Sequence, residues 1–95
     1  MAETHFVVHD KTDMVGVVVV EGVKPKTKLT GWVMATDKTI RMTVLHRIPI
    51  GHKIALKDIA KGDTVIKYGH DIGHMVTAVK KGGHVHVHNL KTKRW

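Results

Sequence analysis

The stretch VGVVVVEGVKPKTKLTGWVMATDKTIRMTVL, residues 15–45, decides the fold class of this chain. It contains three runs rich in β-branched side chains, VGVVVVEG, LTGWVMAT and TIRMTVL. The segments EGVKPKT and ATDKT, which carry turn-forming Gly, Pro and Asp, lie between those runs. Short runs of this kind with closely spaced turns are typical of a compact all-β sandwich or barrel.

The same alternation of strands and turns continues on both sides of this stretch. THFVVH precedes it, TVIKYG and HVHVHN follow it, and further turns are indicated at HDKTD, IPIGHK, KGD, YGHD and KKGG. The best helical candidate is ALKDIA, residues 55–60, which would end at the Lys-Gly-Asp segment 61–63 because glycine adopts the conformation that closes a helix. The sequence therefore predicts a small all-β domain with at most one short helix and with Trp32 in its core.

The length of 95 residues predicts a single domain over residues 1–95, with a basic C-terminal tail at 90–95. Such a domain has little volume for an enclosed active site, so a binding module or an enzyme subunit fits better than a self-sufficient enzyme. The chain has no cysteine and no serine, which excludes disulfides, thiolate-bound clusters and nucleophiles of both types. Because the N-terminus lacks a secretory signal and the valine run 17–20 is too short to span a bilayer, we expect a cytoplasmic protein without a membrane contact.

The chain carries a formal charge of +8 at pH 7 and an isoelectric point near 10.0, values that raise nucleic acid as a partner. Its lysines, however, are scattered between turns, and aromatic residues that could stack on bases are few. Only Lys91, Lys93 and Arg94 form a compact basic cluster. We therefore expect a small anionic substrate or an acidic partner surface rather than DNA or RNA.

Near the C-terminus, GGHVHVHN places histidines at three alternating positions. On a strand, His84, His86 and His88 would share one face, while Val85 and Val87 would point to the opposite, buried face. Same-face neighbours start roughly 6–7 Å apart, so two imidazoles can reach one ion, but the two outer ones converge badly. At most two of the three are therefore expected to bind the same ion.

Two interpretations of these histidines stay open from the residues alone: a site for a metal ion or an anion, and a solvated face on an edge strand. For a metal site, further ligands would come from another segment or another chain. The candidates within this chain are His46, His52 and Asp58. A neutral imidazole suits both Fe(II) and Zn(II), which spacing alone does not separate.

A second candidate site is the turn IPIGHK, in which His52 and Lys53 follow a glycine. A lysine beside a histidine on such a turn can bind a substrate carboxylate or shift the pKa of a neighbouring acid or base. A solvated hairpin is the plainer interpretation, and the residues alone favour it. Tyr68 in KYGHDIG is similarly either a proton donor or a core aromatic with its hydroxyl at the surface. Phosphate-loop, GxGxxG, HExxH and CxxC motifs are absent, so nucleotide-driven chemistry has no support.

The order of these motifs is more specific than any one of them. GHK, DIA, KYG and IG follow one another in IPIGHKIALKDIAKGDTVIKYGHDIG, and HVHVHN comes after them. This ordered set resembles the SAF-type domain of the altronate and galactarate dehydratase family. The resemblance covers most of the chain, is strongest over residues 48–89, and extends to the ending NLKTKRW in the branch formed by small subunits of sulfolactate lyases.

This resemblance implies a β-clip fold, a small all-β domain whose long hairpins fold over themselves. It also implies the small subunit of a two-component lyase that eliminates sulfite from 3-sulfolactate to leave pyruvate. The alternatives are the small subunit of an altronate-type dehydratase and a stand-alone module that binds anions or sugar acids. In the family a large subunit carries most of the catalytic apparatus, so this chain is expected to be inactive alone. The enzymes of the family depend on a divalent metal, for which we expect Fe(II), with Zn(II) as an alternative. Homo-oligomers of the chain are compatible with this expectation.

Elimination beside a carboxylate needs a base, an acid or a metal ion for the departing group, and a cation for the carboxylate. The roles that the resemblance implies are catalysis for His52 and Lys53, substrate binding for Lys53, Tyr68 and Asn89, and metal binding for His84, His86 and His88. In the galactarate branch the segment that matches HVHVHN lacks the histidines. The histidine segment can therefore instead serve substrate choice or subunit docking.

Overall fold

Every regular element of the described chain is a β-strand. The computed structural model describes residues 4–67 and 70–91, and within them it contains no helix, hence none of the length and apolarity that a membrane span requires. The strands are β1 (Phe6–Val8), β2 (Val15–Val18), β3 (Lys28–Val33), β4 (Lys38–Thr43), β5 (Lys53–Ala55), β6 (Thr64–Lys67), β7 (His70–Met75), β8 (His84–Val85) and β9 (Leu90–Lys91). The prediction of a small all-β domain is confirmed.

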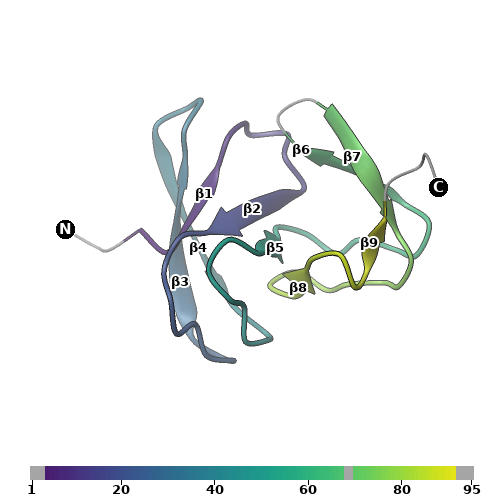
Figure 1. The fold of residues 1–95 in the computed structure, drawn as a ribbon. Helices are drawn as coiled ribbons and strands as arrows, with labels where there is room; N and C mark the ends of the chain where they lie inside the picture. Colours follow the sequence, from purple (N-terminus) through teal and green to yellow (C-terminus); the bar gives the residue numbers. More distant parts are fainter. Residues whose placement is uncertain (1–3, 68–69, 92–95) are drawn as a thin grey trace.

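The strands form two sheets, which stand beside each other in Figure 1. The larger sheet has the strand order β4-β3-β1-β2-β5-β8, and the smaller has the order β6-β7-β9. Paired strands run antiparallel, except that β1 and β3 are parallel. Because β5 pairs with both β2 and β8, the turn before β5 and the segment around β8 are neighbours in space although they lie far apart in the sequence.

The hairpin of β3 and β4 shows how strand alternation sorts the residues of the quoted stretch. Gly31 faces inward, and a Cβ there would lie 2.2 Å from the ring of Phe6, so only glycine leaves room for this core aromatic. Trp32 points the other way and is 39% exposed, which makes the prediction of a buried Trp32 wrong. Its indole Nε1 instead donates to Asp37 Oδ1 at 2.9 Å.

The buried side chains form two clusters that meet along β2 and β5. The first contains Phe6, Val8, Val18, Val23, Leu29, Val33, Met42, Val44, Ile48 and Ile54. The second contains Val15, Ala55, Ile59, Val65, Met75, Val79 and Val85. Since successive strand residues point to opposite faces, β5 contributes Ile54 to the first cluster and Ala55 to the second. Strand β5 is therefore packed on both faces, which fixes the position of the turn before it.

Residues 55–60 do not form the short helix that ALKDIA suggested. Ala55 is the last residue of β5 and pairs with Val15, and Ile59 forms an isolated bridge with Val79. A single helical turn gains too few hydrogen bonds to offset the cost of nucleating it. The extended course is favoured because these pairings satisfy the backbone and bury both Ala55 and Ile59 in the second core cluster.

Candidate functional site

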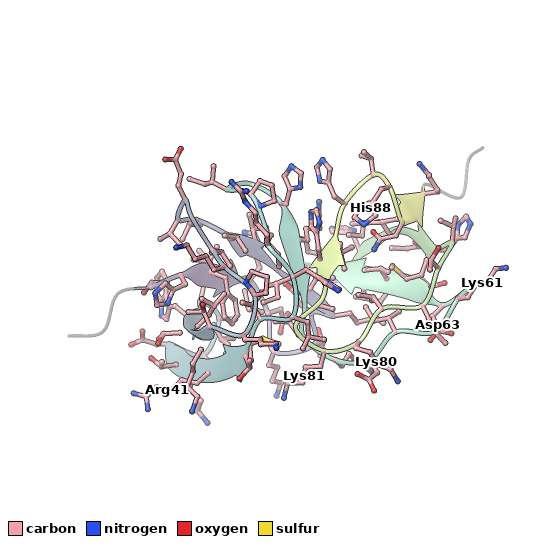
Figure 2. All side chains as sticks on the ribbon, turned by 90° about the horizontal axis from the view of Figure 1, so that it is seen from below. Arg41, Lys61, Asp63, Lys80, Lys81 and His88 are labelled. Atoms are coloured by element: carbon pink, nitrogen blue, oxygen red, sulfur yellow. The ribbon has the colours of Figure 1, made fainter. Side chains whose placement is uncertain are left out.

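Four histidines meet where β5 begins and β8 ends. His52 directly precedes β5, and His84 opens β8. The two strands pair with Ile54 opposite His84, so the same register continued by two residues sets His52 opposite His86. Directly opposed residues on paired strands have neighbouring side chains. His88 follows in the turn after β8, and Figure 2 shows it on the edge of the molecule where several imidazole rings project. We call His52, His84, His86 and His88 the histidine cluster.

The imidazoles of the histidine cluster contact one another. The rings of His52 and His86 are stacked, with centroids 3.5 Å apart and 12° between their planes. His52 Nδ1 and His84 Nε2 form a hydrogen bond of 2.8 Å, in which the donor depends on the tautomer. The rings of His84 and His88 are 4.8 Å apart. The GHK turn and the HVHVHN segment, which the sequence presented as two candidates, thus form one site.

Asn89 shapes this site by turning the chain after β8. Its Oδ1 accepts the backbone N–H of His86 at 3.0 Å, and its Nδ2 donates to the backbone carbonyl of His84 at 2.8 Å. The side chain is 7% exposed. The prediction that Asn89 binds substrate did not include this role in forming the turn. The available signal was the residue type, since an asparagine side chain readily bonds nearby backbone groups in turns.

The histidine strand is shorter than predicted, because β8 ends at Val85 and residues 86–89 form a bend and a turn. Val85 is fully buried as predicted, but Val87, which the alternation also placed in the core, is 66% exposed. The turn also reverses the expected spacing. The outer pair, His84 and His88, has ring centroids 4.8 Å apart, whereas the rings of His84 and His86 are 6.3 Å apart.

Burial and like charges keep two of the four imidazoles neutral. Desolvation by burial, followed by the charges of His88 and the other nearby histidines, lowers the pKa of His84 to about 4. Desolvation, followed by the charges of His52 and Lys53, also lowers the pKa of His86. A neutral imidazole offers one lone pair and one N–H, so it can accept or relay a proton or bind a metal ion.

The geometry of the histidine cluster limits how it could bind a metal ion. A ligating lone pair lies in the plane of the imidazole, so the nearly parallel rings of His52 and His86 direct their lone pairs alongside each other rather than toward one point. His86 Nδ1 is buried without a hydrogen-bond partner in the described structure. Within residues 4–67 and 70–91, no group of three or more His, Cys, Asp or Glu side chains is placed to hold an ion. A metal ion at this site would need ligands from elsewhere.

A hollow of about 380 Å³ opens beside the cluster. It is lined by Leu45, His46, Ala78, Val79, Lys80, His84, His88 and Asn89. His46 belongs to the site through its Nδ1, which accepts the backbone N–H of His84 at 3.1 Å. The volume lies within the usual range of small-molecule sites, so a small hydroxy acid could enter beside the imidazoles.

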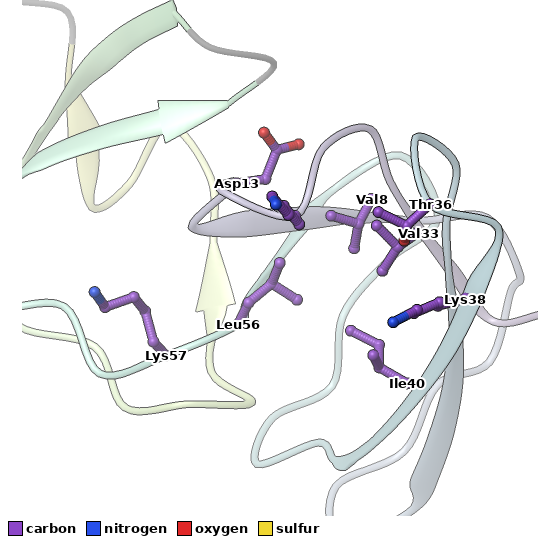
Figure 3. A pocket seen from close by; sticks show the side chains of 9 residues that line it. Val8, Asp13, Val33, Thr36, Lys38, Ile40, Leu56 and Lys57 are labelled. Carbon is purple, nitrogen blue, oxygen red and sulfur yellow. The ribbon is translucent and has the colours of Figure 1, made fainter.

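A different hollow, of about 410 Å³, lies away from the histidines between the β3–β4 hairpin and the segment after β5 (Figure 3). Its wall is formed by Val8, Val33, Ile40 and Leu56, and its other lining residues are Lys11, Asp13, Thr36, Lys38 and Lys57. None of the predicted site residues lines it. The chemistry-bearing side chains are therefore gathered at the histidine cluster rather than at this hollow.

The other predicted site residues are not gathered in the histidine cluster. Lys53 opens β5 directly after His52, and its charge lowers the pKa of His86, so it borders the cluster. Asp58 forms an exposed ion pair with Lys80 at 3.8 Å and accepts the backbone N–H of Lys81 at 2.8 Å, and it is not among the residues that line the hollow. Tyr68 lies outside the described residues.

Comparison with known proteins gives this arrangement a family. The family model described as the altronate/galactarate dehydratase SAF domain matches residues 4–93. The chain belongs to this family. Similar proteins include the (2R)-sulfolactate sulfo-lyase subunit alpha of Chromohalobacter salexigens, which is 60% identical over 90 residues, or 95% of this chain and 96% of the relative. The protein of the same name from Paracoccus pantotrophus is 57% identical over 63 residues, or 66% of this chain and 94% of the relative.

This SAF domain also resembles part of a much longer enzyme. The altronate dehydratase of Escherichia coli is 49% identical over 51 residues, which are 54% of this chain and 10% of the relative. The resemblance inferred from the motif order is therefore confirmed. Sequences similar to this chain occur both as nearly whole alpha subunits and as a small part of altronate dehydratases.

Proposed function

We propose that this chain is the small subunit of a two-component cytoplasmic lyase that removes sulfite from (2R)-sulfolactate. The observation that carries the proposal is its 60% identity to a sulfo-lyase alpha subunit over nearly the full length of both proteins. The alternative, a small subunit of an altronate-type dehydratase, is supported by a shorter alignment that covers a tenth of the relative. We therefore assign sulfolactate as the substrate and a large catalytic subunit as the partner.

The chemistry of sulfite elimination accounts for the residue types at the site. A base removes the proton from the carbon that bears the hydroxyl and the carboxylate, and the C–H electrons form a carbon–carbon double bond. The C–S bond breaks as the double bond forms, its electrons leave with sulfite, and the resulting enol tautomerises to pyruvate. We assign proton transfer to His52, whose Nδ1 is held by the hydrogen bond with His84. Lys53, and Tyr68 beyond the described residues, are assigned to the anionic substrate.

We also propose that a divalent metal, Fe(II) or else Zn(II), binds at the histidine cluster. When bound, the metal would act as a Lewis acid toward a substrate oxygen. The support is the set of neutral nitrogen donors, together with the buried Nδ1 of His86 that has no partner in the described structure. We expect His84, His86 and His88 to supply at most two of the ligands and the large subunit to supply the remainder.

Co-expression with the large lyase chain of the same genome tests the proposed function. The purified complex should release sulfite from (2R)-sulfolactate and should not dehydrate altronate, while each chain alone should be inactive. Metal analysis of the complex should find Fe or Zn, and the double variant H86A/H88A should lose both the metal and the activity. Dehydration of altronate without sulfite release would overturn the substrate assignment, and full metal content in the double variant would overturn the ligand assignment.

A further inference from the structure

Exposed apolar side chains are concentrated around the histidine cluster. Among the described residues, the exposed large hydrophobics other than Trp32 and Met34 adjoin this cluster. They are Val19, Leu45, Ile50 and Val87, with exposed fractions of 41%, 42%, 49% and 66%. We call these four residues the apolar rim. Contiguous apolar surface of this kind marks an interaction site more often than a plain solvated face.

Two residues of the apolar rim flank the GHK turn. Gly51 N–H donates to Val18 O at 2.8 Å, and Val18 N–H donates to His52 O at 2.9 Å. These two hydrogen bonds hold the ends of both segments together, so Val19 and Ile50 lie next to Gly51 of the GHK turn. Ile50 also borders a hollow of about 490 Å³ whose other lining residues are Glu21, Gly22, Val23, Arg47, Ile48 and Pro49.

The other two residues of the apolar rim adjoin the histidines of the HVHVHN segment. Val87 lies between His86 and His88 in the turn that Asn89 closes, and the ammonium of Lys91 donates to its carbonyl, which leaves the valine side chain projecting outward. Leu45 lines the hollow beside the cluster together with His88. Each residue of the apolar rim is therefore next to a segment that carries a histidine of the cluster.

Fixed charges next to this surface include Lys80, which lines the hollow beside the cluster, and Lys91, whose ammonium donates to the carbonyl of Val87. Figure 2 shows Arg41 and Lys81 on the side of the molecule away from His88. Charged residues are depleted in the centres of protein interfaces, while polar and charged groups surround them. Glu21 and Arg47, at the edge of the hollow beside Ile50, fit such a polar border.

We propose that the apolar rim and the histidine cluster together form the surface on which the large subunit of the lyase docks, an inference that rests on the proposed function. His86 Nδ1 is buried without a hydrogen-bond partner within the described structure, so a partner surface with a polar group at this point would satisfy it. A second copy of this chain would bring another formal charge of +8, which disfavours self-association.

Charged substitutions in the rim test this proposal in the co-expressed complex. I50D and V87D should each weaken binding of the large chain about tenfold or more, because an aspartate would be desolvated at the centre of the interface. M34D is the matched control, because Met34 is 42% exposed, close to the 49% of Ile50, but lies after β3. The dissociation constant of the M34D complex should stay within about twofold of wild type. Far-ultraviolet circular dichroism of each purified small chain checks that it is folded.

Photo-crosslinking supplies a second measurement that does not depend on a destabilising change. A benzoylphenylalanine at position 87 should crosslink to the large chain, whereas the same group at position 34 should not. Wild-type affinity for I50D and V87D, or crosslinking from position 34 alone, would overturn the docking surface while leaving the lyase function intact. If the wild-type chain itself fails to associate with the large chain, the proposed function fails, and the docking surface fails with it.

Discussion

Histidines play two contrasting parts in this chain. His5 Nδ1 accepts the backbone N–H of Thr30 at 2.9 Å and ties the segment before β1 to β3. His9 Nδ1 lies 2.8 Å from the ammonium of Lys67. In the histidine cluster, by contrast, His52 stacks on one imidazole and shares a hydrogen bond with another. A histidine with a backbone or lysine partner serves as a structural tie, whereas imidazoles that contact one another keep nitrogens available for chemistry.

The largest effect that this contrast predicts is on turnover. H52A should lower kcat for sulfite release by the complex about 100-fold or more, because a positioned acid–base group contributes on that scale. H5A in the same assay should leave kcat within about twofold of wild type. Steady-state kinetics of the complexes with each variant measure these changes in kcat. Equal losses would show that the distinction between structural and cluster histidines does not hold.

The next effect concerns the turn that brings the cluster together. N89A should lower the free energy of unfolding by about 1–3 kcal/mol, because it leaves the backbone N–H of His86 and the carbonyl of His84 without their partner. V87A, an exposed change in the same turn, should stay within about 0.5 kcal/mol of wild type. Urea unfolding of the two variants measures the difference. An unchanged midpoint for N89A would mean that this asparagine does not hold the turn.

The sequence was sufficient for the fold class because the signal for strands is repeated along the chain. β-branched runs and turn residues recur at short intervals, so one misread element does not change the class. The sequence was less sufficient for predicting the type of a single element. ALKDIA has a helical period over one turn only, and pairing of Ala55 with Val15 and of Ile59 with Val79 decides its actual course. Such long-range pairings are not visible in a local pattern.

The site was predictable in composition but not in shape. The motifs identified His52, His84, His86 and His88, and the structure brings all four together. Strict alternation, however, placed Val87 in the core and the outer histidines far apart. The side chain of Asn89 overrides that alternation by binding the backbone on either side of Val85, so a single polar residue outside the repeat controls the geometry. The placement of His52 opposite His86 depends on the pairing of β5 with β8, which no local sequence pattern specifies.

Acid should lower the free energy of unfolding through His84. The pKa of His84 is lowered to about 4 in the folded chain, while the unfolded chain takes up that proton at the usual value of about 6.5. Below that value the unfolded state binds more protons, so stability is lost as the pH falls from about 6.5 toward 4. The loss should be about 1 kcal/mol once solvent screening is allowed for, and the lowered pKa of His86 acts in the same direction.

Unfolding of the small chain by urea at several pH values measures this dependence, and H84Q provides the matched variant. Glutamine does not titrate, so the slope of stability against pH between 4 and 6.5 should be reduced in H84Q relative to wild type. The same slope in both proteins would show that His84 is protonated as readily in the folded chain as in the unfolded one.

The smallest effect separates the two kinds of histidine at the level of a single atom. H5A removes the acceptor for the backbone N–H of Thr30 and should lower the free energy of unfolding by about 1 kcal/mol. H5N should recover most of that loss, because asparagine Oδ1 occupies nearly the position of the imidazole Nδ1 and accepts the same hydrogen bond. At position 52 the same replacement should not restore turnover, because an amide does not exchange a proton near neutral pH. Rescue by asparagine at position 5 but not at position 52 would show that the fold requires only a hydrogen-bond acceptor at position 5, whereas turnover requires an ionisable ring at position 52.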